Sequence, residues 1–536
     1  MTPNAYDVAR QTFTILMPEF LLLLTATAMM TLGAFTRLPR RSWCATAAVA
    51  LGVALITLLG VGSQAIDPYS AVVTSDAFAS YGRVIFLLTG LLVLCLAHDQ
   101  VDDERAAEFF GSLLMIDAGA MLVAASNELV FLFVGLELVS IPTYLLLYLP
   151  RRTKTTLEAS TKYFFLSIFS SGLLLFGLAY LYGLTGLTNL KAIGYLVNHG
   201  ASGSHGPLAL IALVFLVAGL GFRVAAVPFH FYAPDVYQGS PTVIAALLAW
   251  VPKAIGFLAM LRVLAALVPA TAPGSPLVRQ AVLLAWIIAV ITMTLGNTVA
   301  LAQENLKRLL AYSSIAHAGY LMIGIAVAVA GGGIANGLYS GAEGVLFYLT
   351  AYALMTLGAF GVIILLSTGD RPVETVEDLT GLGWTNPGWG LALAVCLFSL
   401  AGIPPLAGFF GKLELFAAAF AASGGPDGRL FWWLAVIGVL NSAVGAYYYL
   451  KIVVGMYLRQ PTGESLHLRI GWPTALAVTA CAVLSVVFGL YPAPIIHPTH
   501  AAAISVVTLP EPAGAAEFIL PPVKAALNVP PGPPPG

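Results

Sequence analysis

Charged residues are scarce in this sequence. Only 9% of its 536 residues are Asp, Glu, Lys or Arg, whereas 59% are hydrophobic. A water-soluble domain carries roughly a quarter charged residues, so this chain cannot cover a water-facing surface of its own. Its formal net charge of -1 also offers no basic surface for a nucleic acid. We therefore expect a lipid bilayer around the chain and no nucleic-acid partner.

Cysteine is also rare, and each of the four residues stands alone in an apolar stretch: Cys44, Cys95, Cys396 and Cys481. They form no CxxC pair and have no histidine at ligand spacing, so we interpret them as small packing residues. The sequence therefore predicts no iron–sulfur cluster, no metal site and no other cofactor in this chain. Electrons are not expected to pass through it.

Long apolar runs are abundant, and a helix needs about 20 apolar residues to cross a bilayer core of about 30 Å. Fourteen runs fit: 13–35, 43–62, 78–97, 107–126, 129–149, 163–183, 208–232, 242–267, 281–301, 309–330, 344–367, 390–416, 430–458 and 475–491. The first run is too long for a signal peptide and lacks a basic start, so we interpret it as a retained span. The predicted fold class is an all-α integral membrane protein with about 14 transmembrane helices.

The basic residues favour one orientation in the membrane. With the amino terminus outside, the loops after odd-numbered spans contain Arg37, Arg40, Arg41, Arg105, Arg151, Arg152, Lys154, Lys307, Arg308, Arg371, Arg459 and Arg469. The opposite side has only Arg10, Lys191, Arg279, Arg429 and Lys524. We therefore predict a multi-pass protein with both termini on the outer side. The tail 492–536 is rich in Pro and Ala and is predicted to be disordered or draped over the outer surface.

Ionisable residues inside apolar runs are expensive, at about 2.5–3.5 kcal/mol for a charge at mid-membrane. Five lie within spans, and a sixth opens the sixth span: Glu137, Arg223, Lys253, His317, Lys412 and, at the span start, Lys162. A lysine held away from water releases its proton more easily, so these groups together suggest a hydrated chain that passes a proton. Glu137 could instead form a static ion pair, Lys162 could reach the interface, and His317 could be a hydrogen-bonded core residue.

Other ionisable residues lie closer to the predicted span ends. They are Glu19, Arg83, Asp117, Arg262, Glu343 and Lys451. For these we predict positions at the membrane interface.

Two spans contain helix-breaking prolines close to a basic residue. The seventh has Val-Pro-Phe-His after Arg223, and the twelfth has Ala-Gly-Ile-Pro-Pro-Leu-Ala-Gly before Lys412. Proline removes a backbone donor and clashes with the preceding turn, and an unwound segment at membrane depth survives only inside protein or beside water. The two breaks lie five spans apart and so have opposite orientations, which is the pattern of inverted repeats.

The segments that contain these residues resemble the antiporter-like membrane subunits of respiratory complex I. They are Val-Gly-Leu-Glu-Leu-Val-Ser-Ile-Pro around Glu137, Val-Pro-Phe-His-Phe-Tyr-Ala-Pro-Asp-Val-Tyr-Gln-Gly-Ser-Pro from Val227, Asn-Leu-Lys-Arg-Leu-Leu-Ala-Tyr-Ser-Ser-Ile-Ala-His-Ala-Gly-Tyr from Asn305, and Ser-Leu-Ala-Gly-Ile-Pro-Pro-Leu-Ala-Gly-Phe-Phe-Gly-Lys from Ser399. The resemblance runs from about the third to the fourteenth span. A lysine rather than a glutamate at position 412 makes it similar to the N-type subunits in particular.

The resemblance implies a proton-translocating subunit of NADH:quinone oxidoreductase in the bacterial plasma membrane. It implies that Glu137 is the charge switch, that Lys253 and His317 form the central relay, and that Lys412 is the group of the outward half. The other membrane-arm subunits would be its partners, and FMN, the iron–sulfur clusters and quinone would lie in partner subunits. Two related functions stay open: a subunit of a multisubunit cation/proton antiporter, or of a membrane-bound hydrogenase. A purely structural role for the buried charges also stays open.

One residue departs from the family pattern, because Arg223 stands where the family usually has a lysine. Arginine stays protonated below about pH 12, so we predict that Arg223 acts as a fixed positive charge on Glu137.

The resemblance also gives a division of the chain. Residues 1–106 would form helices 1–3, 107–267 the first inverted repeat (helices 4–8) and 268–458 the second (helices 9–13). Helix 14 would occupy 459–491, and 492–536 would be the tail.

Overall fold

The computed structural model describes most of the chain. The described residues are 5–62, 64, 66–149, 153–199, 207–268, 275–331, 340–367, 372–425, 427–460 and 471–507. Within these ranges the secondary structure is α-helix, apart from short 3₁₀ turns and isolated bridges. Residues 508–536, and with them most of the predicted tail, lie outside the described residues.

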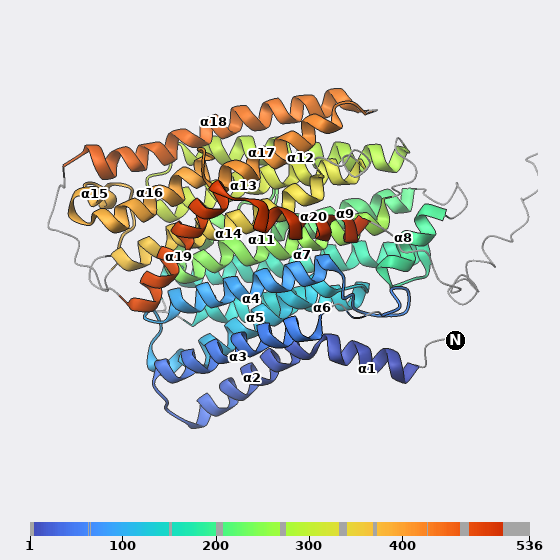
Figure 1. Cartoon of the computed structure of the whole chain (residues 1–536), viewed down its shortest axis with the longest axis horizontal. Helices are drawn as coiled ribbons and strands as arrows, with labels where there is room; N and C mark the ends of the chain where they lie inside the picture. The colour runs from blue at the N-terminus through green and yellow to red at the C-terminus, as the bar shows by residue number, and fades with distance from the viewer. Residues whose placement is uncertain are drawn as a thin grey trace, which may run out of the picture.

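The helices follow one another with short connections (Figure 1). The first part contains α1 (Ala5–Ile15), α2 (Met17–Phe35), α3 (Arg40–Val61), α4 (Ala77–Ala97), η1 (Asp103–Arg105), α5 (Ala106–Ala125), α6 (Leu129–Tyr148), α7 (Lys154–Thr185), α8 (Leu190–His199), α9 (Pro207–Arg223), α10 (Ala233–Gly239) and α11 (Thr242–Leu267). The second contains α12 (Pro276–Ala300), α13 (Leu306–Val329), α14 (Gly341–Leu366), η2 (Glu377–Leu379), α15 (Leu382–Thr385), α16 (Pro387–Ala401), α17 (Ala407–Ala422), α18 (Gly428–Leu458), α19 (Trp472–Leu490) and α20 (Ala493–Val507).

Among the described residues, twelve helices are long and apolar enough to cross a membrane. Two shorter apolar helices, α9 and α16, each continue beyond a break into a further helix, α10 and α17. With these two broken spans the number agrees with the fourteen predicted. The long helices run roughly side by side in one bundle (Figure 1).

The two predicted helix breaks are present. Helix α9 ends at Arg223, and the chain resumes a helix only at Ala233. Helix α16 ends at Ala401, where Gly402 adopts a left-handed φ of 86°, a conformation that suits glycine after a helix end. Within each successive set of five spans the break falls in the fourth span, as inverted repeats require.

The first predicted span is wrong as a single helix. The chain bends at Leu16, and α1 and α2 are separate helices. Pro18 lies in the first turn of α2, where its missing N–H costs nothing. The apolar run of the sequence continues through this bend, so hydropathy alone did not reveal it.

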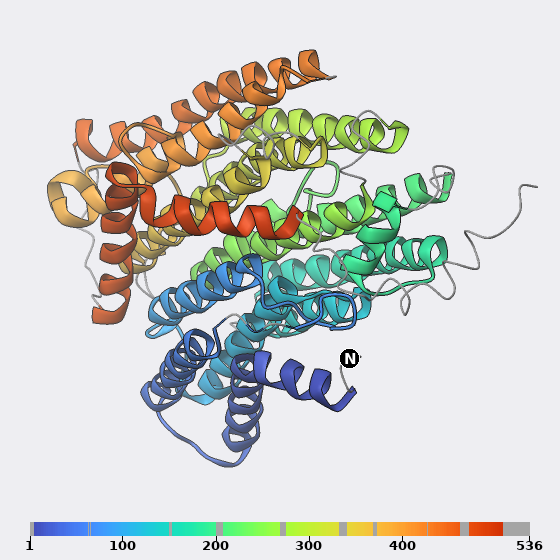
Figure 2. The ribbon, with the colours of Figure 1, turned by 45° about the vertical axis from the view of Figure 1, so that its right-hand side comes forward.

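The start of the tail is not disordered, because Ala493–Val507 forms helix α20. The chain turns between α19 and α20, and α20 lies over the bundle (Figures 1 and 2). Ser505, near its end, accepts a hydrogen bond from the backbone N–H of Phe78 on α4 at 3.0 Å. Closer to its middle, Nδ1 of His500 lies 2.9 Å from a carboxylate oxygen of Glu343 on α14. The prediction averaged composition over the whole tail and missed this apolar stretch.

Helices α11 and α14 occupy the centre of the bundle. Nearly all of their side chains are buried. Glycines let neighbouring helices approach closely, as in other membrane bundles: a Cβ atom on Gly119 of α5 would lie only 3.0 Å from the backbone oxygen of Gly135 on α6. The central position of α11 brings Lys253 away from lipid.

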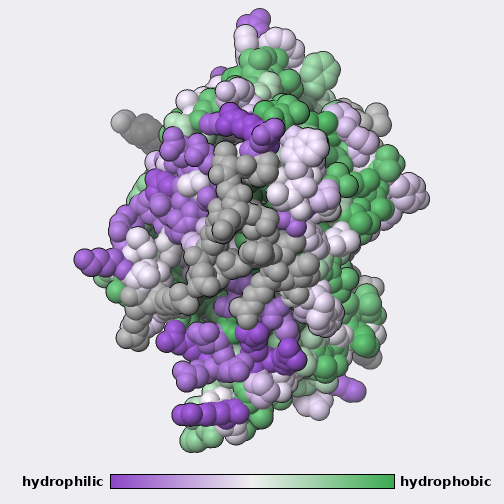
Figure 3. Space-filling model, turned by 90° about the vertical axis from the view of Figure 1, so that its left-hand side faces the viewer, coloured by the Kyte–Doolittle hydropathy of each residue, from purple (hydrophilic) through white to green (hydrophobic). Residues whose placement is uncertain are grey.

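Hydrophilic residues gather at the end of the bundle where α3 begins and α4 ends, and hydrophobic residues lie along one flank (Figure 3). At this end, Arg37 lies in the connection before α3, Arg40 and Arg41 are the first two residues of α3, and Arg105 ends η1. Lys154, at the start of α7, belongs to a predicted cytoplasmic cluster whose Arg151 and Arg152 lie outside the described residues.

Candidate functional site

Glu137 of α6 and Arg223 of α9 form an ion pair. Glu137 lies near the middle of α6, and Arg223 is the last residue of α9. A terminal nitrogen of Arg223 lies 2.8 Å from Oε1 of Glu137. The Ser171 hydroxyl on α7 donates to the same oxygen at 2.6 Å. Arg223 is 6% exposed and Glu137 is 23% exposed, so the carboxylate lies at the edge of the bundle.

Arg223 is held from several directions. Its other terminal nitrogen donates to the Leu136 carbonyl at 3.2 Å and to the Ser140 hydroxyl at 2.6 Å, both on α6. A cation at the carboxyl end of α9 is also favoured by the helix dipole. The guanidinium is therefore fixed beside Glu137.

Lys162 does not join this pair. Its side chain is 38% exposed, and its ammonium pairs with Asp235 at 2.7 Å and with Glu158 at 2.5 Å. Asp235 lies on α10, just after the seventh-span break, and also pairs with Arg308 of α13 at 2.7 Å. Asp235 therefore connects the first repeat to the second, a role that sequence reasoning missed although the residue lies within one of the quoted motifs.

Lys253 lies 1% exposed in the middle of α11. Its ammonium donates to the Ser314 carbonyl on α13 at 2.6 Å and also contacts the Ser314 hydroxyl. The Tyr352 hydroxyl donates to the hydroxyl oxygen of Ser314 at 2.8 Å, and the Tyr237 hydroxyl lies 3.3 Å from that same oxygen. Lys253 is thus bound by hydroxyl and carbonyl groups rather than by a carboxylate.

His317 is fully enclosed on α13. Nδ1 lies 2.5 Å from the Tyr348 hydroxyl, and Nε2 lies 3.0 Å from the Tyr449 hydroxyl. Tyr449 in turn contacts the Ser313 hydroxyl. Both ring nitrogens therefore have a hydroxyl partner that can act as either donor or acceptor, which lets the ring exchange tautomers.

Lys412 lies at the second helix break. Its ammonium donates to the carbonyls of Leu400 at 3.0 Å and Ala401 at 2.9 Å, and to the Ser442 hydroxyl at 2.9 Å. It therefore caps the last turn of α16, whose carbonyls have no helical partner. A side chain on Gly402 would meet Lys412 at 2.9 Å, so glycine is needed here for space as well as for its φ.

Helix α13 connects the two lysines. Ser314 binds Lys253, His317 follows three residues later, and Tyr320 three residues after that. The Tyr320 ring lies 5.0 Å from the Lys412 ammonium, and the rings of His317 and Tyr320 are 5.7 Å apart. Residues three apart share one helix face, so α13 presents a buried polar stripe between Lys253 and Lys412. We name Lys253, Ser314, His317, Tyr320 and Lys412 the central row.

The ion pair and the central row approach each other at α11. A Cβ atom on Gly256, one turn from Lys253, would lie 3.4 Å from the Cβ atom of Arg223. Between Arg223 and Lys253 the described residues show no direct hydrogen bond.

The serines and tyrosines of this region were missed by sequence reasoning. Ser314, Tyr320, Tyr348, Tyr352 and Tyr449 are all buried hydroxyls. The spacing of Ser314, His317 and Tyr320 by three was the available signal, but tyrosine and serine are common in apolar helices.

Several charges predicted at the interface are buried within the bundle instead. Arg83 of α4 donates to Glu19 of α2 at 2.6 and 2.5 Å, and both side chains are at most 2% exposed. Glu343 pairs with His500, and Asp117 is fully buried with one carboxylate oxygen lacking a partner. Of the six residues predicted at the interface, Lys451 is the one that is exposed. Neighbouring helices, rather than lipid or water, surround these span ends.

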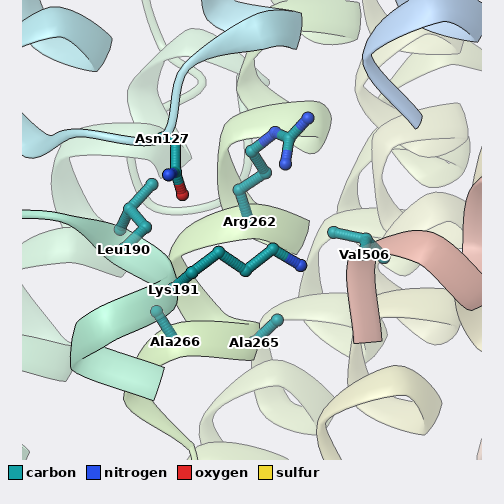
Figure 4. Close-up of a pocket in the computed structure, with 7 residues that line it drawn as sticks. All are labelled: Asn127, Leu190, Lys191, Arg262, Ala265, Ala266 and Val506. Carbon is teal, nitrogen blue, oxygen red and sulfur yellow. The ribbon is translucent and has the colours of Figure 1, made fainter. Parts of the chain in front are cut away.

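Arg262, another of these charges, pairs with Asp76 at 3.0 Å near the carboxyl end of α11. It also borders a small hollow of about 20 Å³ with Lys191 and Asn127 (Figure 4). The Lys191 ammonium donates to the Ser505 carbonyl of α20 at 3.1 Å. Burial raises the pKa of Asp76, but the charge and hydrogen bonds of Arg262 offset this and hold the pKa below its usual 3.8.

The substitution Asp76→Asn is expected to lower the free energy of unfolding by about 3–5 kcal/mol, because it leaves the buried Arg262 without its counter-ion. Asparagine can still accept the α4 capping bond from Ala79. A lowered carboxyl pKa contributes stability that is fully present above the unfolded pKa of about 3.8 and is lost as the pH falls from there through the folded value. Thermal unfolding of the purified assembly should therefore show the same difference between variant and parent at pH 7 and pH 4.5. A difference that shrinks at pH 4.5 would contradict the lowered pKa.

The family described as NADH:quinone oxidoreductase/Mrp antiporter, TM, matches residues 126–445. The NADH-quinone oxidoreductase subunit N of Trichlorobacter lovleyi is 39% identical over 493 residues, covering 90% of this chain and 95% of the relative. The subunit N of an Anaeromyxobacter species is 38% identical, covering 86% of this chain and 91% of the relative. The chain belongs to the family of NADH-quinone oxidoreductase N subunits. The predicted resemblance is confirmed.

Solved structures agree with this N-subunit membership. A chain of respiratory complex I from Thermus thermophilus, with bound aureothin, matches with a TM-score of 0.72 and 34% identity, covering 90% of this chain and 98% of that one. The Mrp complex from a Dietzia species matches with a TM-score of 0.77 at 20% identity, covering 96% of this chain and 100% of that one. The second likeness concerns the fold alone. The roles of Glu137, Arg223 and the central row in this N-subunit remain predictions.

Proposed function

We propose that this chain translocates protons as the N-type membrane subunit of an NADH:quinone oxidoreductase. The observation that carries the proposal is the central row, in which two buried lysines are joined by a histidine and hydroxyl groups through α13. Such groups can each take up and release a proton or relay one. Charges at this depth are costly, so a row of them points to a function in transport.

In this proposal Glu137 is the charge switch and Arg223 the fixed cation beside it. A change in the charge of Glu137 alters the field at α11, and Lys253 responds by exchanging its proton with the row. His317 passes the proton by tautomer exchange between its two hydroxyl partners, and Lys412 receives it in the second half. Lys162 acts at the inner surface through Asp235, which joins both halves.

The partners are the other membrane-arm subunits of the complex, and FMN, the iron–sulfur clusters and quinone belong to those partner subunits. We assign the chain to the bacterial plasma membrane with both termini on the outer side, since most Lys and Arg residues lie at the opposite end. The segments 107–267 and 268–458 are the two inverted repeats, each with its break in the fourth span.

A native gel of gently solubilised membranes tests this function. The gel is stained for NADH-dependent dye reduction and then probed for this chain. Comigration with the NADH-oxidising band is expected. If the chain runs in a smaller assembly without that activity, it belongs to a cation/proton antiporter or another complex, and cation-driven proton exchange is then the assay.

The substitution Arg223→Lys is expected to keep proton pumping within about threefold, a change of less than 1 kcal/mol, because the fixed charge beside Glu137 is retained. Arg223→Met removes that charge and is expected to lower pumping by about tenfold. Both are measured as NADH-driven acidification of inverted membrane vesicles. Equal damage by lysine and methionine would show that the arginine geometry, and not its charge, is what matters.

A further inference from the structure

A large hollow lies between α3, α4 and α19, far from the central row. Its volume is about 760 Å³, which lies within the roughly 300–1,000 Å³ of a typical small-molecule site. It sits at the end of the bundle where α3 begins, α4 ends and α19 begins. Figure 3 shows that hydrophilic residues gather at this end.

The mouth of the hollow is polar, and one of its two arginines has no ion-pair partner among the described residues. It contains Arg40, Arg41, His98 and Asp99. Arg40 pairs with Asp99 at 3.3 Å, and His98 also lies 3.0 Å from Asp99. Arg41 is exposed and makes no ion pair within the described part of the chain. One carboxylate oxygen of Asp103 accepts from the backbone N–H of Arg40 at 2.9 Å, so Arg40 lies beside two carboxylates and Arg41 is the arginine of the mouth without an ion pair in the described chain.

The wall below the mouth is apolar and made largely of small side chains. Cys44, Ala45 and Ala48 of α3 face Leu94 and the neighbouring residues of α4 across it. Small side chains leave room for a chain of methylene groups. Farther along α3, Val49 and Ile56 are 64% and 69% exposed, so the apolar surface continues toward the middle of the membrane.

Trp472 borders the mouth at the start of α19 and is 73% exposed. Tryptophan is enriched at the boundary between lipid headgroups and acyl chains. The hollow therefore has a mouth with two arginines, an aromatic residue at headgroup level and an apolar wall below. This order of surfaces follows the order of groups in a phospholipid.

We propose that the hollow between α3, α4 and α19 binds an anionic phospholipid, with its phosphate at Arg41 and Arg40 and an acyl chain along α3. Basic pockets between transmembrane helices on the cytoplasmic side bind anionic headgroups in this way. The phosphate gives Arg41 the counter-ion that it lacks, and an anionic headgroup brings no second cation beside it, whereas a zwitterionic headgroup does. The site goes beyond proton translocation and does not depend on it.

Photo-crosslinking in nanodiscs tests the proposal on the intact complex. The probes are phosphatidylglycerol and phosphatidylcholine that carry the same photoactivatable acyl chain, and labelled peptides are mapped by mass spectrometry. Phosphatidylglycerol is expected to label α3 and the start of α19 about fivefold more than phosphatidylcholine, since one arginine near an anionic lipid contributes about that factor. Arg41→Gln should bring the two probes close to equal.

Two further variants keep the test decisive. Arg459→Gln removes an exposed arginine after α18, outside the hollow, and should leave the preference unchanged. Ala45→Trp fills the apolar wall but keeps both arginines, and should abolish labelling by both probes. Native gels confirm that each variant assembles.

Three results would overturn the proposal. They are equal labelling by the two probes in the parent complex, equal labelling by phosphatidylethanolamine and phosphatidylglycerol, and no lipid labelling of the hollow in an assembled complex. The last would mean that a partner subunit fills it. None of these measurements requires turnover, so failure here leaves the proposed proton function untouched.

Discussion

Replacing Lys253 with methionine is expected to lower NADH-driven acidification of inverted vesicles by about tenfold or more. Methionine matches the length of lysine but removes the proton-carrying ammonium that binds Ser314. Lys253→Arg is expected to be nearly as damaging, because arginine keeps the charge but does not release its proton near neutral pH. The pair of variants therefore separates proton transfer from simple charge.

The matched control for Lys253 is Lys451→Met. Lys451 is exposed on α18, and its loss should leave acidification unchanged. NADH-dependent dye reduction and the native-gel band should be normal in all three variants, because the electron-transfer subunits are untouched. Full pumping by Lys253→Met in an assembled complex would remove Lys253 from the pathway, and full pumping by Lys253→Arg would limit it to a fixed charge.

The second large effect is expected at Glu137. Glu137→Gln preserves the shape of the side chain, and the glutamine oxygen can still accept from Ser171 and Arg223. The negative charge is lost, however, and Arg223 no longer has a counter-ion. We expect the number of protons moved per electron to fall, with acidification reduced by about tenfold or more.

Glu158→Gln is the control for this substitution. Glu158 is 61% exposed and pairs only with the surface-directed Lys162 among the groups described here, so its loss should have little effect on the proton-to-electron ratio. If Glu137→Gln also left that ratio unchanged, the pair with Arg223 would be a static packing element rather than a switch.

The spans and the breaks could be predicted because lipid imposes strong and local rules. A run of about 20 apolar residues and a proline beside glycine both have direct structural consequences. The buried ionisable residues Glu137, Lys253 and Lys412 could be found in the same way, since their positions deep in apolar runs had no interfacial explanation.

The partners of these residues could not be predicted, because they depend on how helices rotate against one another. Nothing in the sequence places Ser314 beside Lys253 or Tyr449 beside His317. The prediction for Arg83 and Arg262 failed for a related reason. It assumed that a charge near a span end faces lipid headgroups, whereas neighbouring helices of a large bundle cover those ends. Lys162 differs from these two arginines, because it is partly exposed and its ion-pair partners Glu158 and Asp235 are at least partly exposed as well.

Helix α20 restricts how the molecule can move. Many transporters expose a site alternately to each side of the membrane by rocking one repeat against the other. Here α20 is hydrogen-bonded to α4 and α8 through Ser505 and to α14 through His500. Because α8 lies in the first proposed repeat and α14 in the second, α20 connects the two. Any rocking would have to break these contacts together. A rocking motion is therefore opposed at α20, which favours exchange through side chains and the two unwound segments over movement of whole repeats.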